Sequence, residues 1–223
     1  MRRVLLASVG ILTLAAMVGP GGAADLPRRY DPNVPKAPAF TQIYNWTGFY
    51  VGINGGGGWG HSAWTTTNGF DVSGGLVGGT AGYNWQMGQW VFGVEGDVDW
   101  SNINGNTVAG CPFGCQTSNT WLATLRGRVG YAFDRFMPYV TGGAAFGDIR
   151  ATTPGFAGFS DTNAGWAVGG GLEFAIYYNW TAKAEYLYVD LGNTNCGLSC
   201  GVVAPNNVSF RSNILRAGLN YRF

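Results

Sequence analysis

The final residues of this sequence alternate strictly between two kinds of side chain. Ala217, Leu219, Tyr221 and Phe223 share one parity, whereas the residues between them are arginine, glycine or asparagine. Side chains of a β-strand point to opposite faces with a period of two, so this stretch predicts a strand with one apolar and one polar face. We expect the chain to end on this strand, with an aromatic side chain as its last residue.

Seven further segments are predicted as strands, six of them with the same alternation, which gives an even number of strands in all. Each is close to or above the roughly 9–11 residues that a tilted membrane strand needs. The fifth segment is rich in glycine and alanine, and its two faces are not assigned by the pattern. In chain order, the predicted strands lie at about residues 47–59, 76–85, 90–100, 121–133, 138–149, 166–176, 180–188 and 210–223.

The segments between these strands alternate in length. Short turns follow the second, fourth and sixth strands, at residues 87–89, 134–136 and 178–179. Long polar connections follow the first, third, fifth and seventh, at residues 61–73, 101–120, 150–165 and 190–209. Short periplasmic turns that alternate with long extracellular loops are typical of an outer-membrane barrel. The expected fold is therefore all-β, a transmembrane eight-stranded antiparallel up-and-down β-barrel.

The first residues have the layout of a secretory leader. Arg2 and Arg3 precede an apolar run from Val4 to Val18, and small residues follow as far as Ala24. This arrangement predicts a cleavable signal peptide rather than a membrane-spanning helix. Four prolines then favour an extended spacer. The expected organisation is a signal peptide at 1–24, a proline-rich periplasmic segment at 25–44 and an outer-membrane barrel at 45–223.

The composition supports a surface that faces lipid. Charged residues are 11% of the chain, against roughly 25% in ordinary soluble domains. Loss of the leader would remove two of the 13 basic residues and leave 12 acidic ones, which gives no basic surface for nucleic acid. A water-soluble sandwich is the alternative, but its apolar faces would have to point inward. Tryptophans near the strand ends predict aromatic girdles at both membrane interfaces: Trp46, Trp59, Trp85, Trp90, Trp100, Trp121, Trp166 and Trp180.

If the apolar faces contact lipid, the opposite faces fill the lumen. An eight-stranded bore is just wide enough to be filled by side chains, and charges inside it must be paired. We therefore expect an ion-pair network and a largely closed lumen, with a narrow porin for small solutes as the alternative. The predicted network consists of Glu95, Asp97, Asp99, Arg126, Arg128, Glu173, Lys183, Glu185, Arg216 and Arg222.

The cysteines form two local C-x-x-x-C pairs in the predicted second and fourth loops. They are the disulfide candidates Cys111 and Cys115, and Cys196 and Cys200. A secreted chain meets an oxidising compartment, which favours disulfides, and four cysteines allow three connectivities. A zinc site would favour C-x-x-C spacing or histidine partners, and the single histidine lies far away in the sequence. We expect no metal and no cofactor.

An enzyme that modifies lipid A is a further alternative. His61 and Ser62 suggest a base and a nucleophile, but neighbouring strand residues point to opposite faces. Glu95 and Asp97 could form a glycosidase pair, although arginines on the next strand favour ion pairing instead. The sequence predicts that the protein is not an enzyme.

Several motifs resemble the outer membrane immunogenic protein group of porin-like β-barrel proteins. They are Ala24-Asp25-Leu26-Pro27, Asn45-Trp46-Thr47-Gly48-Phe49-Tyr50-Val51-Gly52, Pro138-Tyr139-Val140-Thr141-Gly142-Gly143, Lys183-Ala184-Glu185-Tyr186 and the terminal Phe223. The resemblance covers about residues 44–223 and implies a barrel in a Gram-negative outer membrane, often abundant and antigenic. It also implies that Leu219, Tyr221 and Phe223 are an assembly signal read by the barrel-assembly machinery. The cysteine pairs depart from the group's pattern.

The expected partners follow from this location. Outer-membrane lipid would contact the barrel wall, and the barrel-assembly machinery would contact the last strand. Peptidoglycan could contact the basic residues of the proline-rich segment, and host ligands could contact the loops. No nucleic acid is expected.

Overall fold

The computed structural model describes residues 44–64, 69–108, 114–152, 155, 158–195 and 207–223. The predicted leader and nearly all of the proline-rich segment lie outside these ranges and stay predictions. Among the described residues, no helix is long and apolar enough to cross a membrane.

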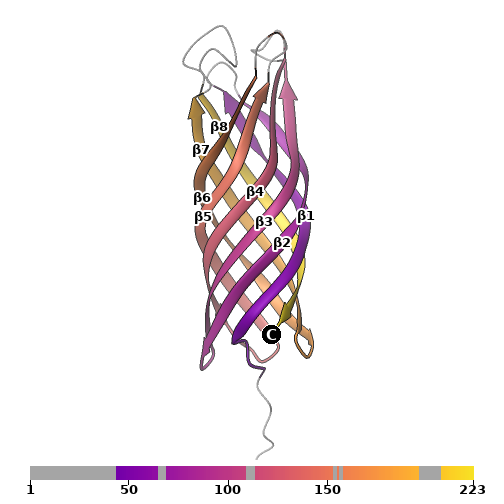
Figure 1. Ribbon diagram of the computed structural model, residues 1–223, viewed down its shortest axis with the longest axis vertical. Coiled ribbons are helices and arrows are strands. Elements are labelled where there is room, and N and C mark those ends of the chain that lie inside the picture. Colours follow the sequence, from indigo (N-terminus) through magenta and orange to yellow (C-terminus); the bar gives the residue numbers. More distant parts are fainter. Residues whose placement is uncertain (1–43, 65–68, 109–113, 153–154, 156–157, 196–206) are drawn as a thin grey trace, which may run out of the picture. The chain divides into compact units, whose positions relative to one another are not determined.

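Eight antiparallel strands form one closed barrel in chain order, as Figure 1 shows. The first and last strands complete the ring, with pairing from Tyr50 opposite Arg222 to Trp64 opposite Val208. The prediction of an eight-stranded up-and-down barrel is thus confirmed. The strands are β1 (Gly48–Trp64), β2 (Phe70–Met87), β3 (Trp90–Thr107), β4 (Cys115–Tyr131), β5 (Phe136–Thr152), β6 (Phe159–Tyr177), β7 (Trp180–Asn195) and β8 (Asn207–Arg222).

The strands are longer than predicted at the end of the barrel that carries the long connections. Residues 61–64 and 70–73, predicted as loop, belong to β1 and β2, and residues 101–107 and 115–120 belong to β3 and β4. The prediction assigned these polar residues to loops, but their backbones continue the hydrogen-bonded pairing of the strands. The short turns at the opposite end were placed nearly correctly.

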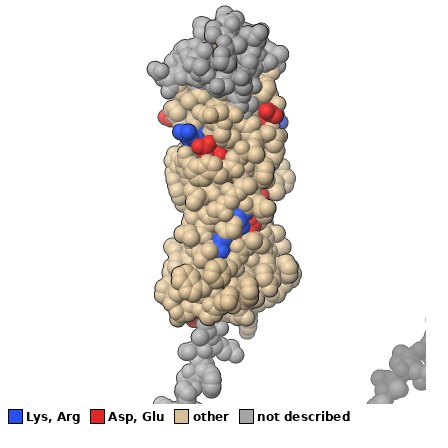
Figure 2. Space-filling view, turned by 90° about the vertical axis from the view of Figure 1, so that its left-hand side faces the viewer, with Lys and Arg blue, Asp and Glu red and all other residues tan. Residues whose placement is uncertain are grey.

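The apolar faces point outward, as the alternation predicted. Phe49, Ile53 and Trp100 are each about two-thirds or more exposed, at 67%, 68% and 70%. Figure 2 shows a wall that is uncharged over most of its surface. The structure assigns the faces of the fifth strand, which the sequence pattern left open: Tyr139 and Ile149 are buried inside the barrel, while Val140 is 65% exposed on the wall.

One predicted girdle residue has a different role. Trp46 is 1% exposed and lies inside the mouth of the barrel at the end with the short turns. Its indole Nε1 donates a hydrogen bond to the backbone oxygen of Asp134 at 3.0 Å. Trp46 packs in a small apolar cluster with Val91, Ala132, Met137 and Ala175. The girdle assignment was wrong for Trp46 because it precedes β1 and turns into the bore.

A second apolar cluster fills the bore toward the opposite end, beginning at about the level of the outward-facing tryptophans Trp59, Trp100, Trp121 and Trp166, here called the upper girdle. It contains sixteen buried residues, including Ile103, Ile149, Leu187 and Phe210. At the same height, the outer surface carries exposed charges such as Asp71, Arg150 and Arg211. Figure 2 shows charged atoms at this level and a second group at mid-height. The polarity of the two faces is therefore reversed along each strand. Within the membrane the wall is apolar and the bore charged, and beyond it the bore is mainly apolar, with uncharged polar residues such as Ser62 and Thr117, while the wall carries charges.

Glycines on the inner face allow the strands to approach closely. A Cβ atom added at Gly56 would lie 2.1 Å from the carbonyl oxygen of Leu215, and one added at Gly60 would lie 1.9 Å from that of Arg211. Outward glycines have more room, since the nearest atom to a Cβ at Gly57 would be 3.8 Å away. The glycines compared here within β1 thus differ by face, and those that face the bore are required by packing.

These neighbouring positions give a matched test. Gly56→Ala should lower the free energy of unfolding by about 1–3 kcal/mol, because the added methyl group overlaps the next strand. Gly57→Ala should leave it unchanged, because its methyl group points toward lipid. Urea unfolding of the refolded protein in lipid vesicles, followed by tryptophan fluorescence, measures both. Equal midpoints for the two variants would contradict the assigned faces.

The length of the strands can be tested by labelling. Asn104 lies near the top of β3 on the outer wall, and Val98 lies on the same wall between the girdles. On intact cells, a membrane-impermeant maleimide should label Asn104→Cys and spare Val98→Cys. Reaction at both positions, or at Val98→Cys alone, would place the membrane elsewhere on the wall.

Candidate functional site

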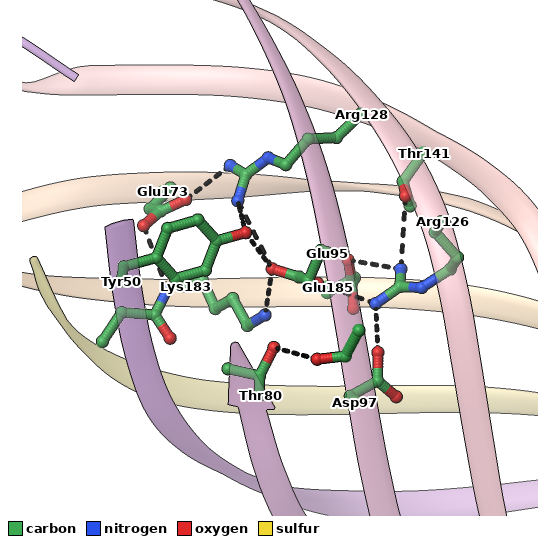
Figure 3. A network of polar contacts seen from close by, with 12 residues as sticks. Tyr50, Thr80, Glu95, Asp97, Arg126, Arg128, Thr141, Glu173, Lys183 and Glu185 are labelled. Atoms are coloured by element: carbon green, nitrogen blue, oxygen red, sulfur yellow. Dashed lines mark hydrogen bonds and ion pairs between the residues drawn. The ribbon is translucent and has the colours of Figure 1, made fainter. Parts of the chain in front are cut away.

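The inner faces of five strands bring nine predicted charged residues together in the middle of the bore. Each of the nine is buried, with at most 3% of its surface exposed. The strand register sets two contacts directly, because Glu95 lies opposite Arg126 and Glu185 lies opposite Arg216. Figure 3 shows the side chains pointing toward one another inside the barrel.

Two arginines hold the centre of the network. Arg126 Nη2 lies 2.7 Å from both Glu95 Oε1 and Asp97 Oδ2, and its Nη1 lies 3.0 Å from Glu185 Oε1. Arg216 approaches from β8, with Nη1 at 2.9 Å from Asp97 Oδ1 and Nη2 at 2.7 Å from Glu185 Oε2. Each guanidinium therefore bridges carboxylates from different strands, which its planar fork of donors is suited to do.

The other two cations link strands that are not neighbours in the barrel. Arg128 Nη2 on β4 lies 2.5 Å from Glu173 Oε2 on β6. Lys183 lies directly opposite Glu173 in the register, but its Nζ bonds Glu95 Oε2 on β3 at 2.9 Å. Lys183 thus pairs with a partner across the bore and not with its cross-strand neighbour, and this bond joins the charges of β3 and β4 to those of β7 in one network.

Uncharged side chains complete the network, and the sequence prediction did not include them. Tyr50 donates a hydrogen bond to Glu95 at 2.7 Å, and Tyr139 donates one to Glu185 at 3.1 Å. The ring of Tyr139 also lies 4.1 Å from the Arg128 guanidinium. The inward position of Tyr50 in the alternation of β1 could have predicted its place in the network. Tyr139 could not be predicted in this way, because it lies on the strand whose faces were not assigned. Further donors to the carboxylates are Thr124, Thr181 and Asn220.

Arg222 is a correction to the predicted network. It has inward parity, but its guanidinium stacks on the ring of Tyr44 at 4.5 Å and forms no ion pair with the described carboxylates. It lies too close to the mouth of the barrel to reach the central carboxylates. Five carboxylates therefore share four cations, and Asp99 is held at the edge by Arg216 alone, at 2.7 Å.

The network fills the bore and leaves no carboxylate free for chemistry of the glycosidase type. Glu95 and Asp97 are both bound to Arg126. Removing an ion pair from water is expensive, and the arrangement is tolerated because four of the five carboxylates each accept from two or more donors. Within the described residues, no cluster of three or more histidine, cysteine or acidic side chains could hold a metal ion.

His61 and Ser62 lie within β1, not at the start of a loop, and they point to opposite faces as expected. The His61 Nδ1 atom lies 3.2 Å from Asp71 on the outer wall. The Ser62 hydroxyl is buried and lies 3.0 Å from that of Thr117. The two side chains therefore cannot act together as base and nucleophile.

The remaining predicted residues that the structure describes lie toward the two ends of the barrel. Cys115 is disulfide-bonded and buried at the start of β4, not in a loop. Cys111, Cys196 and Cys200 lie outside the described residues. Leu219 and Phe223 are exposed on the outer wall, at 44% and 72%, and Tyr221 lies on the same face. Their reading as an assembly signal stays a prediction.

A closed antiparallel barrel with an apolar wall, a charged bore and short turns at one end defines an integral outer-membrane β-barrel protein. A family model described as "outer membrane protein beta-barrel domain" matches residues 35–223. The chain belongs to this family, and its location is the cell outer membrane.

Two named relatives are also outer-membrane proteins. The 31 kDa outer-membrane immunogenic protein of Brucella melitensis biotype 1 is 37% identical, over 97% of this chain and 99% of its own length. The 22 kDa outer membrane protein of Rhizobium leguminosarum bv. viciae is 34% identical, over 80% of this chain and 79% of its own length. These matches confirm the resemblance drawn from the sequence motifs.

A solved structure supports the fold. Neisserial surface protein A (NspA) superposes with a TM-score of 0.51 at 19% identity, covering 79% of this chain and 98% of that structure. This similarity shows a shared barrel architecture.

The network predicts a large difference between buried and exposed ion pairs. Arg126→Met should lower the free energy of unfolding by about 3–5 kcal/mol, because it leaves buried carboxylates without a partner. Arg211→Met, which breaks an exposed pair with Asp190 on the outer wall, should cost at most about 1 kcal/mol. Urea midpoints in lipid vesicles compare the two. If Arg126→Met lowered the free energy of unfolding no more than Arg211→Met, the network would not stabilise the barrel.

Proposed function

We propose that this protein is a structural surface protein of the outer membrane, with a closed lumen and loops available for interactions. The observation that carries the proposal is the continuous filling of the bore. The Trp46 cluster occupies the end with the short turns, the charged network occupies the middle, and the Ile103 and Leu187 cluster occupies the other end. A general diffusion pore would need roughly 16 strands to leave an aqueous channel.

Exposure to the outside follows from the same architecture. The strands continue past the upper girdle of tryptophans, so the loops that join them would lie outside the lipid. The Brucella melitensis relative is named an immunogenic protein, and we infer that this chain is antigenic as well. Host ligands are candidate partners for its loops.

Delivery and assembly complete the proposal. Residues 1–24 would act as a cleaved leader, with residues 25–44 as a periplasmic spacer that could meet peptidoglycan. Leu219, Tyr221 and Phe223, on the outer face at the end of β8, would be read by the barrel-assembly machinery. We propose no enzymatic activity, since His61 faces Asp71 on the outer wall while Ser62 faces the bore.

Conductance is the direct test of the closed lumen. The refolded protein in a planar lipid bilayer should show no stable current steps of nanosiemens size, because three layers of side chains obstruct the bore. A general diffusion porin reconstituted in the same way is the positive control. Large stable steps from this protein would support the narrow-porin alternative and overturn the closed lumen.

A further inference from the structure

The mouth of the barrel at the end with the short turns contains a pocket that the lumen network does not use. Its volume is about 750 Å³, and its lining includes Tyr44, Arg135, Tyr177, Tyr178, Asn179 and Arg222. These residues come from the segment before β1, the β4–β5 turn, the β6–β7 turn and the end of β8. The pocket therefore collects side chains from parts of the sequence that are far apart.

The charges of this pocket are not balanced by its lining. It contains two guanidinium groups, Arg135 and Arg222, and no carboxylate. Neither arginine forms an ion pair with a carboxylate of the described residues, in contrast to the four cations of the lumen. The neighbouring carboxylate of Asp134 accepts a hydrogen bond from the Tyr44 backbone at 3.0 Å. Glu173, deeper in the bore, is already bound to Arg128 at 2.5 Å.

Two buried donors in the pocket also lack partners. Arg222 Nη1 and the Tyr44 hydroxyl are both shielded from solvent and form no hydrogen bond. The Arg222 guanidinium is fixed over the Tyr44 ring at 4.5 Å. A buried polar group without a partner costs free energy, so two at one place need an explanation. A bound anion that accepts hydrogen bonds from both groups would supply that explanation.

The shape of the pocket favours a ligand that enters from the periplasm. Ala175 and Arg222 belong to the inner faces of β6 and β8, so the pocket lies inside the mouth and not on the lipid-facing wall. A phospholipid headgroup would have to leave its leaflet to reach it. Guanidinium forks suit carboxylates, tyrosine rings can pack on aliphatic stems, and the Asn45 and Asn179 amides match peptide groups.

We propose that this mouth binds an acidic peptide through its carboxylates, of the kind that cell-wall stem peptides present. The inference rests on the proposed function only for its statement that this end faces the periplasm. Arg222 and Arg135 would bind the carboxylate groups, and the Tyr44 hydroxyl would donate a further hydrogen bond.

The test uses the purified, folded, full-length protein in detergent micelles and a synthetic stem tetrapeptide that contains D-glutamate and diaminopimelate. Calorimetry should detect binding that weakens as salt is raised. Arg135→Gln and Arg222→Gln should each weaken binding roughly tenfold or more, since a charge-assisted hydrogen bond is lost. Arg211→Gln, at the other end of the barrel, is the matched control and should bind normally.

Tyr44→Phe separates binding from folding. It should weaken peptide binding while the urea midpoint stays equal or rises, because a buried hydroxyl without a partner has been removed. Arg135 lies in an exposed turn, so its variant tests the site even if Arg222→Gln does not assemble.

Competing ligands decide the chemical class. The amidated tetrapeptide, inorganic phosphate and vesicles of anionic phospholipid should each bind much more weakly than the acidic peptide. Equal binding of phosphate or lipid, or undiminished binding by the arginine variants, would overturn the proposal. Because the measurement is made on purified protein, it is independent of conductance, and labelling on intact cells separately tests which end faces outward.

Discussion

The hydrogen-bonded closure of β8 onto β1 determines most of this structure. In a bilayer no water can satisfy backbone groups, so a sheet can cross only if it has no free edges. Closure with eight strands gives a narrow bore, and two consequences follow. Glycines are needed where neighbouring strands curve toward each other, as at Gly56 and Gly60. The remaining volume must be filled by side chains, since too little room is left for an aqueous channel.

The reversal of polarity along the strands is a second consequence of the environment. Between the girdles, outward residues meet hydrocarbon, so charges are confined to the bore. Beyond the upper girdle, the same barrel is surrounded by water, and burial of apolar side chains inside it becomes favourable. Ile103 and Trp100, three residues apart on β3, show the change, because Ile103 is 1% exposed and Trp100 is 70% exposed. The upper part of the barrel thus resembles a soluble barrel placed on a membrane barrel.

Much of this architecture could be predicted from alternation and from loop lengths. Pairs such as Glu95 with Arg126 follow from hairpin register, which is local in the sequence. The bond from Lys183 to Glu95 does not, because it depends on which walls face each other across the closed ring. The true strand ends were missed for a related reason: polar outward residues in water look like loop residues. Trp46 was misplaced because it precedes β1, where alternation no longer indicates a lipid face. Arg222 was misplaced because inward parity does not show how far along the bore a side chain lies.

The contrast between the centre of the bore and its periplasmic mouth is the feature that packing alone does not explain. In the centre, every arginine and lysine has carboxylate partners, which is the condition for burying charge in a membrane protein. At the mouth, Arg222 and Arg135 have none among the described residues, although the same chain places five carboxylates in the central network. A structural role would be satisfied by one more acidic side chain on a neighbouring strand. Leaving two cations and a tyrosine hydroxyl unpaired around an open pocket is instead the arrangement expected of a site whose anion comes from outside the chain.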